Sequence, residues 1–255
     1  MKQTIFFFVL TAVLFGCMQN ADDSKKELLI YCGITMIKPV SEIAQIIEKQ
    51  ENCKIIITKG GSGNLLKSLK TNQVGDLFLP GSELYIKTCL EEKIVIKTEF
   101  VGYNKAAMMV QKGNPKNIPA DLDVLQDEKY YVVIGNHNSG SIGKETKKIL
   151  EKKGIFKKVQ KNARELTTDS KDLISVLKNK DADVVMNWFA ASTWDENKDF
   201  VEALPIDEKF AKKKKLVIGL LTYSEHPEIA VKFMDYAQSK AGNELFRKYG
   251  LYDPE

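Results

Sequence analysis

The stretch KIIITKGGSGNLLKSL, Lys54 to Leu69, joins an apolar run to a helical pattern through a loop with three glycines around Ser62. Lys54–Thr58 has the composition of a buried strand, and Leu65–Leu69 has the spacing of a helix. Backbone N–H groups at a helix start lack intrahelical partners, and the helix dipole favours negative charge there. Glycine allows close approach to the backbone, and Ser62 adds a hydroxyl donor. The loop therefore predicts an anion-binding element, with a simple helix-capping serine as the alternative.

A second unit of the same form lies further along the chain. Tyr130–Ile134 is apolar and strand-like, and the polar, flexible segment GNHNSGS follows at 135–141. Ile142–Lys153 then predicts a helix, with Gly154 as its C-terminal cap. Two strand–loop–helix units thus each offer serines and unobstructed backbone.

Gly143-Lys144 superficially matches the phosphate-binding loop of ATPases. That motif needs a glycine five positions before the Gly-Lys pair and a serine or threonine after it. Asn138 and Glu145 occupy those positions. The sequence therefore does not predict an ATPase.

The sequence offers no catalytic signature. Ser62 lies in Gly-Gly-Ser-Gly rather than in the Gly-x-Ser-x-Gly nucleophile pattern, and neither His137 nor His226 has an evident serine or cysteine partner. We therefore expect a protein without enzymatic activity or cofactor. An exported α/β enzyme is the alternative.

The cysteines give neither a disulfide framework nor a metal signature. After Cys17, three remain, Cys32, Cys53 and Cys89, without CxxC spacing. With only two histidines, a multi-histidine metal site is excluded. We expect no bound free cation, and Cys32 and Cys53 are interpreted as small buried hydrophobic residues.

The N-terminus has the pattern of an export signal. A short cationic start precedes the apolar stretch Ile5–Phe15, and Leu14-Phe15-Gly16-Cys17 is similar to the lipobox of bacterial lipoproteins. The similarity implies a signal peptide over 1–16, thioether lipidation of Cys17 and a lipidated linker over 17–26. The mature protein would be periplasmic or at the cell surface, anchored by lipid to a bacterial membrane.

Charge balance argues against nucleic acid as a partner. The 38 basic and 34 acidic residues nearly cancel, giving a net charge of +4. The one basic run, Lys212–Lys215, is predicted to be a solvated loop.

Strand-like and helix-like segments alternate from residue 27 onward, which is typical of an α/β protein. The alternation pauses at 101–104 and again at 205–215. These pauses predict two lobes, the first from residues 27–103 plus 217–255 and the second from residues 104–216.

Four blocks in order and spacing resemble the periplasmic molybdate-binding protein family of ABC importers. They are Ile30–Met36, Gly60–Leu65, Gly75–Leu79 and Phe246–Leu251, and the resemblance covers the mature chain. It implies the two-lobed type II periplasmic binding protein fold with two crossover hinge strands. It also implies a monomer that binds a tetrahedral oxyanion, molybdate or tungstate first, in the interlobe cleft and delivers it to a membrane permease.

The family's binding positions fall on residues of both lobes. Thr35 and Ser62 take the positions of two hydroxyl donors, and Ser139 and Ser170 those of two backbone donors. Trp188 takes the position of a tyrosine whose phenol donates. Each serine or threonine is also a plausible helix cap, and the neighbours of Ser170, residues 167–169, are equally polar.

Trp188 departs from the family pattern. Its indole N–H is still a donor, but it is bulkier than a phenol and lies elsewhere, and a core aromatic is the alternative role. Asn187 or His137 could supply the missing contact. A cleft of neutral donors alone would favour fully deprotonated molybdate, tungstate or sulfate over hydrogen phosphate, which brings a proton that needs an acceptor. Sulfate, thiosulfate, phosphate and small organic acids remain alternative ligands.

Overall fold

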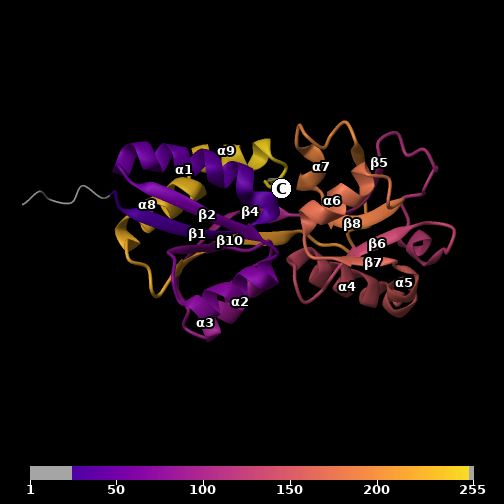
Figure 1. Ribbon diagram of the computed structural model, residues 1–255, viewed down its shortest axis with the longest axis horizontal. Helices are drawn as coiled ribbons and strands as arrows, with labels where there is room; N and C mark the ends of the chain where they lie inside the picture. Colours follow the sequence, from indigo (N-terminus) through magenta and orange to yellow (C-terminus); the bar gives the residue numbers. More distant parts are fainter. Residues whose placement is uncertain (1–24, 253–255) are drawn as a thin grey trace, which may run out of the picture.

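The structure of this chain is a computed structural model that describes residues 25–252. Two five-stranded sheets, each flanked by helices, lie side by side along the long axis (Figure 1). The predicted two-lobed α/β fold is confirmed. The proposed signal peptide, Cys17 and most of the proposed linker lie outside the described residues.

One sheet, with its helices, is called lobe 1 here. β1 runs parallel to both its neighbours, and β10 runs antiparallel to both of its own. The strand order is β2 (Lys54–Gly60), β1 (Glu27–Gly33), β3 (Leu77–Leu79), β10 (Lys214–Leu221) and β4 (Val95–Asn104).

The other sheet and its helices, called lobe 2, repeat this arrangement. β6 is parallel to both neighbours, and β5 is antiparallel to both of its own. The order is β7 (Glu165–Thr167), β6 (Val132–Gly135), β8 (Val184–Trp188), β5 (Ala106–Gln111) and β9 (Val201–Leu204).

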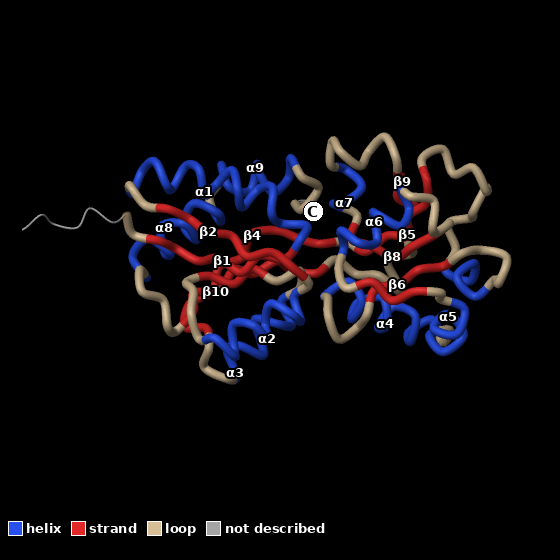
Figure 2. The backbone as a smooth tube through the Cα atoms, viewed as in Figure 1, coloured by secondary structure: helices blue, strands red, loops and turns tan. Residues whose placement is uncertain are grey.

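The chain crosses between the lobes twice, and Figure 2 shows strands running across the middle of the molecule. Only Lys105 separates β4 in lobe 1 from β5 in lobe 2, and residues 205–213 return the chain from β9 to β10. The fourth strand of each sheet is therefore the one that arrives from the other lobe. At the first pause expected from the sequence, the chain continues as β-structure from one lobe to the other. At the second pause it forms a loop. The proposed boundaries, after residues 103 and 216, fall inside β4 and β10.

Helices cover both faces of the lobe 1 sheet. α1 (Ile37–Glu51) carries the predicted apolar stripe, with Val40, Ile43 and Ile47 buried. It packs with α8 (Pro227–Gln238) and α9 (Lys240–Lys248) on one face, while α2 (Ser62–Asn72) and α3 (Glu83–Glu91) cover the other (Figure 1). A separate buried apolar cluster lies under each face.

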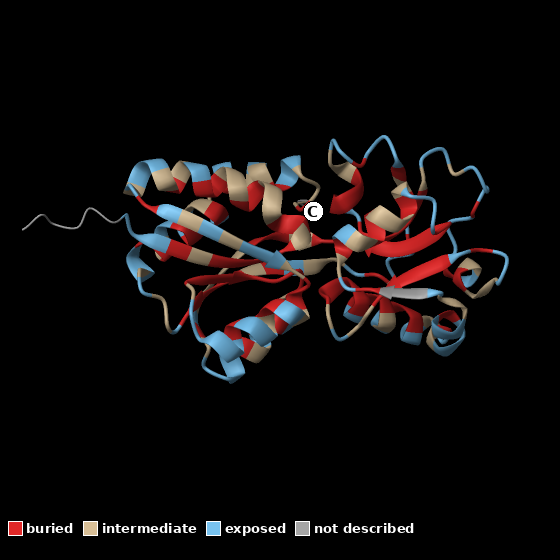
Figure 3. Cartoon of the chain, in the orientation of Figure 1, coloured by how far each residue is buried: buried red, intermediate tan, exposed pale blue. Residues whose placement is uncertain are grey.

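Lobe 2 is built around a single buried apolar cluster. α4 (Ser141–Lys153) and α5 (Phe156–Asn162) lie on one side of its sheet, and α6 (Ser170–Lys178) and α7 (Ala190–Thr193) on the other (Figure 1). The short 3-10 helix η2 (Leu122–Gln126) packs near α5. Gly154 caps α4 with a φ of 81°, as predicted. Figure 3 shows buried residues along most strands of the two sheets, with the edge strand β2 partly exposed, and exposed residues on the outer faces of the helices.

The basic run at 212–215 is not the solvated loop that was expected. Lys214 and Lys215 begin β10, and Lys214 forms a 2.9 Å ion pair with Glu145 of α4. Both side chains of the pair are largely buried, at 15% and 5% exposure. Pairing of β10 with β4 brings the lysine to the boundary between the lobes, and this non-local contact is not visible in the local sequence.

Three cysteines of the described chain, Cys32, Cys53 and Cys89, are free and buried, as interpreted for the first two. Burial raises the pKa of Cys32, and raises that of Cys89 to about 11, so both remain thiols at neutral pH. No helix within residues 25–252 is long and apolar enough to cross a bilayer.

Candidate functional site

The carboxyl ends of the parallel strands in both sheets point toward the boundary between the lobes. β1 leads into the 3-10 helix η1 (Ile34–Met36) and α1, and β2 leads into α2. In lobe 2, β6 leads into α4 and β7 into α6. Ligands of open α/β sheets bind beyond these strand ends, so the boundary is the first place to seek a site.

Three of these helices begin with a serine. Ser62, Ser141 and Ser170 are the first residues of α2, α4 and α6, and their exposed fractions are 1%, 7% and 4%. Each therefore sits at the positive end of a helix dipole with its hydroxyl withdrawn from bulk water. One helix comes from lobe 1 and two from lobe 2.

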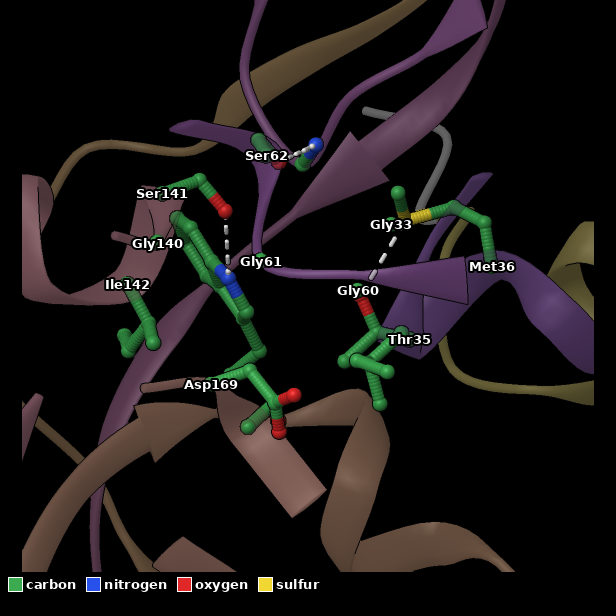
Figure 4. Close-up of a pocket in the computed structure, with 14 residues that line it drawn as sticks. Gly33, Thr35, Met36, Gly60, Gly61, Ser62, Gly140, Ser141, Ile142 and Asp169 are labelled. Atoms are coloured by element: carbon green, nitrogen blue, oxygen red, sulfur yellow. Dashed lines mark hydrogen bonds between the residues drawn. The ribbon is translucent and has the colours of Figure 1, made fainter. Parts of the chain in front are cut away.

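A single cavity brings these helix starts together. Figure 4 shows Thr35 and Met36 on one side and Ser141, Ile142 and Asp169 on the other. Its volume of about 10 Å³ leaves room for about one water molecule. The two lobes are therefore closed around it. The polar side chains that line it are Thr35, Ser62, Ser141, Asp169, Ser170 and Trp188.

Two lining hydroxyls accept hydrogen bonds from the protein. Ser62 Oγ accepts from the Gly81 amide at 2.9 Å, and Ser141 Oγ accepts from Trp188 Nε1 at 3.2 Å. A hydroxyl that accepts in this way keeps its own proton available for a ligand. Ser62 and Ser141 thus offer positioned donors from opposite lobes.

Thr35 and Ser170 have different surroundings. Thr35 Oγ1 contacts Met36 Sδ at 3.1 Å and lies 3.4 Å from Asn104 Nδ2, at the end of β4. Ser170 Oγ donates to Asn187 Oδ1 at 2.6 Å, and Asn187 Nδ2 returns a bond to the Ser170 carbonyl at 2.9 Å. Thr35 gives its proton only to a weak thioether acceptor, so it can turn to a ligand at little cost. Ser170 is held in place by Asn187.

The structure brings together four of the five residues that the sequence proposed for the site. Thr35, Ser62, Ser170 and Trp188 line the cavity, and Trp188 also belongs to the buried cluster of lobe 2. The role of core aromatic is therefore confirmed, and the indole N–H of Trp188 donates to Ser141. His137 packs edge-on against Phe156 with ring centroids 6.3 Å apart, and it is not among the lining residues.

Ser139 makes an interlobe contact beside the cavity. Its carbonyl accepts from the amides of Gly63 at 3.0 Å and Asn64 at 3.1 Å, and its hydroxyl donates to the Thr168 carbonyl at 2.9 Å. Ser141, two residues later, lines the cavity instead. A sequence signal for it existed, because Gly140-Ser141 stands at the start of α4 as Gly61-Ser62 stands at the start of α2.

The glycines before and after Ser62 allow the two lobes to touch. A Cβ on Gly61 would lie 2.5 Å from the Ser139 carbonyl oxygen, and one on Gly63 would lie 2.5 Å from that of Asn138. Both neighbours are backbone atoms of lobe 2, which cannot move aside as a flexible side chain would. The glycine loop is thus where backbone of one lobe meets backbone of the other.

Asp169 is the one ionisable side chain among the described residues that line the cavity. Its Oδ1 caps α6, accepting from the amides of Lys171 at 2.7 Å and Asp172 at 3.3 Å. Burial raises the pKa of Asp169, while the capping amide of Lys171 opposes the rise. The expectation of a cleft with donors alone is therefore wrong, because this carboxylate is an acceptor.

Four lysines and one glutamate line a larger cavity that adjoins the site. This cavity of about 470 Å³ shares Ile34 and Ser170 with the first, and its charged lining residues are the lysines at 38, 59, 171 and 178 and Glu196. Lys38 of lobe 1 pairs with Glu196 of lobe 2 at 2.7 Å. An excess of positive charge beside the site, rather than at its centre, attracts anions without fixing one in place.

Comparison with known sequences gives a match along nearly the whole described chain. Residues 28–252 match the family described as bacterial extracellular solute-binding protein. A candidate binding protein of Haemophilus influenzae is 28% identical over 225 residues, covering 88% of this chain and 90% of that one. The candidate ABC transporter substrate-binding lipoprotein YvgL of Bacillus subtilis is 27% identical, with 98% of each chain covered.

Solved structures share the fold at low sequence identity. The periplasmic molybdate-binding protein of Azotobacter vinelandii superposes with a TM-score of 0.75 at 13% identity, covering 89% of this chain and all of that one. Structures described as binding sulfate, thiamin or L-phospholactate give TM-scores of 0.68 to 0.75 at 15% to 18% identity. At these identities the likeness establishes the fold alone.

Proposed function

Because this chain belongs to the family of bacterial extracellular solute-binding proteins, we propose that it captures a tetrahedral oxyanion between its lobes and delivers it to the permease of an ABC importer. One observation carries the proposal. The buried serines that begin α2, α4 and α6 come from both lobes and line one cavity. Helix N-termini with hydroxyl donors are a ready-made site for an anion.

The site would hold its ligand with dipoles and neutral donors. No lysine, arginine or histidine is among the described residues that line the cavity. In a closed, dry cleft, hydroxyl and amide donors gain strength because the surrounding dielectric is low. The lysines of the adjoining cavity would raise the rate of capture rather than contribute contacts.

The family resemblance places molybdate and tungstate first among the oxyanions to test. Sulfate, thiosulfate, phosphate and small organic acids complete the panel, because similar folds are described with sulfate and with L-phospholactate. A carrier releases its ligand chemically unchanged, so recovery of an altered ligand would favour the alternative, an exported enzyme.

A thermal-shift titration with this panel tests the ligand class. The melting temperature should rise with the logarithm of the ligand excess over Kd. If no member of the panel shifts it, the proposal of an oxyanion carrier is wrong.

A double variant tests the site. Thr35→Ala with Ser62→Ala removes two lining hydroxyls and should weaken oxyanion binding by about tenfold or more. The matched control is Thr88→Ala with Ser175→Ala, which removes two partly exposed helix hydroxyls that bond only to carbonyls four residues earlier. Equal affinity in the two double variants would place the oxyanion elsewhere.

A further inference from the structure

Asp169 is an acceptor in a cavity otherwise lined by polar side chains that can donate. We infer that Asp169 selects oxyanions that still carry a proton, of the hydrogen phosphate type, over fully deprotonated ones such as sulfate, molybdate and tungstate. The inference rests on the proposed function and names the preferred members of its ligand class.

The geometry leaves half of this carboxylate available. Oδ1 receives both capping hydrogen bonds from the first turn of α6. Within residues 25–252, no hydrogen bond reaches Oδ2. Asp169 directly precedes Ser170, whose buried hydroxyl and carbonyl are both held by Asn187. The acceptor is therefore held in place.

Hydrogen phosphate and sulfate are a well-matched pair for comparing a protonated with a fully deprotonated oxyanion. Both are tetrahedral dianions of nearly equal size, and they differ by one proton. The P–OH group can donate to Asp169, forming a hydrogen bond with a charged partner, which is stronger than a neutral one. Sulfate has only acceptor oxygens, so one of them would face a carboxylate with no proton between them. That repulsion, and the loss of hydration on both groups, would reject it.

Helix capping alone does not require the charge. Serine, threonine and asparagine cap helices about as well as aspartate, and asparagine is nearly isosteric with it. Asp169→Asn should therefore keep α6 intact while removing the negative charge and replacing one acceptor oxygen by a donor amide. The variant separates selection of the ligand from capping.

The test is calorimetric titration with inorganic phosphate, sulfate and molybdate at mildly alkaline pH, where phosphate is mainly HPO₄²⁻. The wild-type protein should bind phosphate more tightly than sulfate by about tenfold or more. Asp169→Asn should reduce that phosphate-to-sulfate ratio by about tenfold or more, with sulfate or molybdate gaining affinity.

Asp172→Asn is the matched control. It removes the same charge from the same first turn, but Asp172 accepts from the Thr168 hydroxyl at 2.5 Å and is not a lining residue. Its phosphate-to-sulfate ratio should equal that of the wild type.

Two outcomes would overturn the inference while leaving the proposed function standing. One is a wild-type protein that prefers sulfate or molybdate to phosphate, and the other is an Asp169→Asn variant with an unchanged ratio. Failure of the whole oxyanion panel to bind would overturn the proposed function, and this inference with it.

Discussion

The hydroxyls of Ser62 and Ser141 are oriented before any ligand arrives. Each accepts a hydrogen bond from a group fixed by the fold, the Gly81 amide and the Trp188 indole. Gly81 can lie there because it has no side chain. A Cβ at this position would collide with Ser141 Oγ. Donors oriented in advance cost little side-chain entropy on binding. At this scale, we expect affinity for the proposed ligand to depend on these hydrogen bonds from Gly81 and Trp188, which hold the two serine hydroxyls in place.

Gly61→Ala should weaken ligand binding by keeping the lobes apart. Its Cβ would lie 2.5 Å from the Ser139 carbonyl and 3.0 Å from that of Thr168, both backbone atoms of lobe 2. Overpacking of this kind costs about 1–3 kcal/mol, or about fivefold to a hundredfold in affinity. Affinity measurements and the radius of gyration at saturating ligand test the effect.

Gly60→Ala is the control for that variant. Its Cβ would meet only Leu65 of the same lobe, at an ordinary 3.5 Å. It should close and bind as the wild type does. If Gly61→Ala behaves in the same way, close approach of the two backbones is not needed for binding.

Glu42 should make part of the stability depend on acid pH. Hydrogen bonds from Lys248 and Tyr249 lower the pKa of this carboxyl. A carboxyl with a lowered folded-state pKa stabilises the fold above its unfolded pKa, and that stability is lost as pH falls through the folded value. The difference in unfolding free energy between wild type and Glu42→Gln should thus be largest near neutral pH and vanish in acid.

Urea denaturation over a pH series measures this difference. Tyr249→Phe removes the second of the two hydrogen bonds and should reproduce only part of the effect. A difference between wild type and Glu42→Gln that stays constant across the series would contradict the assignment.

Helix ends explain why the site forms at the boundary of the lobes. The starts of α2 and α4 receive no hydrogen bond from a capping side chain, whereas α6 is capped by Asp169. The free amides of α2 at Gly63 and Asn64 bond to Ser139 across the cleft. Buried helix starts need such partners. The interlobe contact therefore uses a helix start that α2 itself leaves uncapped, and the proposed ligand would use such helix starts as well.

Glu145→Gln should destabilise the fold through the junction of α4 with β10. The Glu145–Lys214 pair is 2.9 Å long, with side chains only 5% and 15% exposed. Removal of one partner from a buried pair leaves a charge without compensation, and we expect a loss of about 3 kcal/mol in unfolding free energy. Urea denaturation at neutral pH gives this value.

Glu151→Gln provides the comparison on the same helix. Its pair with Lys147 is 3.9 Å long and exposed, at 54% and 36%, so its loss should cost less than about 1 kcal/mol. Equal stability of the two variants would show that burial of the Glu145–Lys214 pair does not matter to the fold.

At the scale of the whole molecule, two chain crossings connect the lobes, and we expect the lobes to move about them as units. Lys105 alone joins β4 to β5, and a loop joins β9 to β10. A ligand held from both lobes would favour the closed form, and a permease could recognise that form. Attachment to the membrane would keep the loaded protein near its transporter.

Cys17→Ser tests the membrane attachment. Without the thiol, lipidation is impossible, so the protein should move from the membrane fraction to the soluble fraction. Cys53→Ser, at a buried free cysteine, should leave the distribution unchanged. A Cys17→Ser protein that stays in the membrane fraction would disprove the lipid anchor.

Local patterns in the sequence determined the alternation of strands and helices, and they singled out the glycine-rich loop of Ser62. Periodicity and glycine-rich loops act over a few residues, so these features can be read without a fold. Thr35, Ser170 and Trp188 were proposed from the family resemblance instead. The short strands β7 and β9 and the antiparallel pairing of β5 with β8 and β9 were not predicted, because long-range pairing creates them.

The composition of the cleft was decided by the tertiary structure. That Ser141 rather than Ser139 lines it, that Trp188 holds Ser141, and that Asp169 brings a carboxylate into it depend on how two lobes meet. Residues far apart in the chain become neighbours there, and a shift of two residues along a loop turns a lining side chain into an interlobe contact. Sequence patterns specify each helix start separately, whereas only the docking of the lobes determines which atoms of those starts face one another.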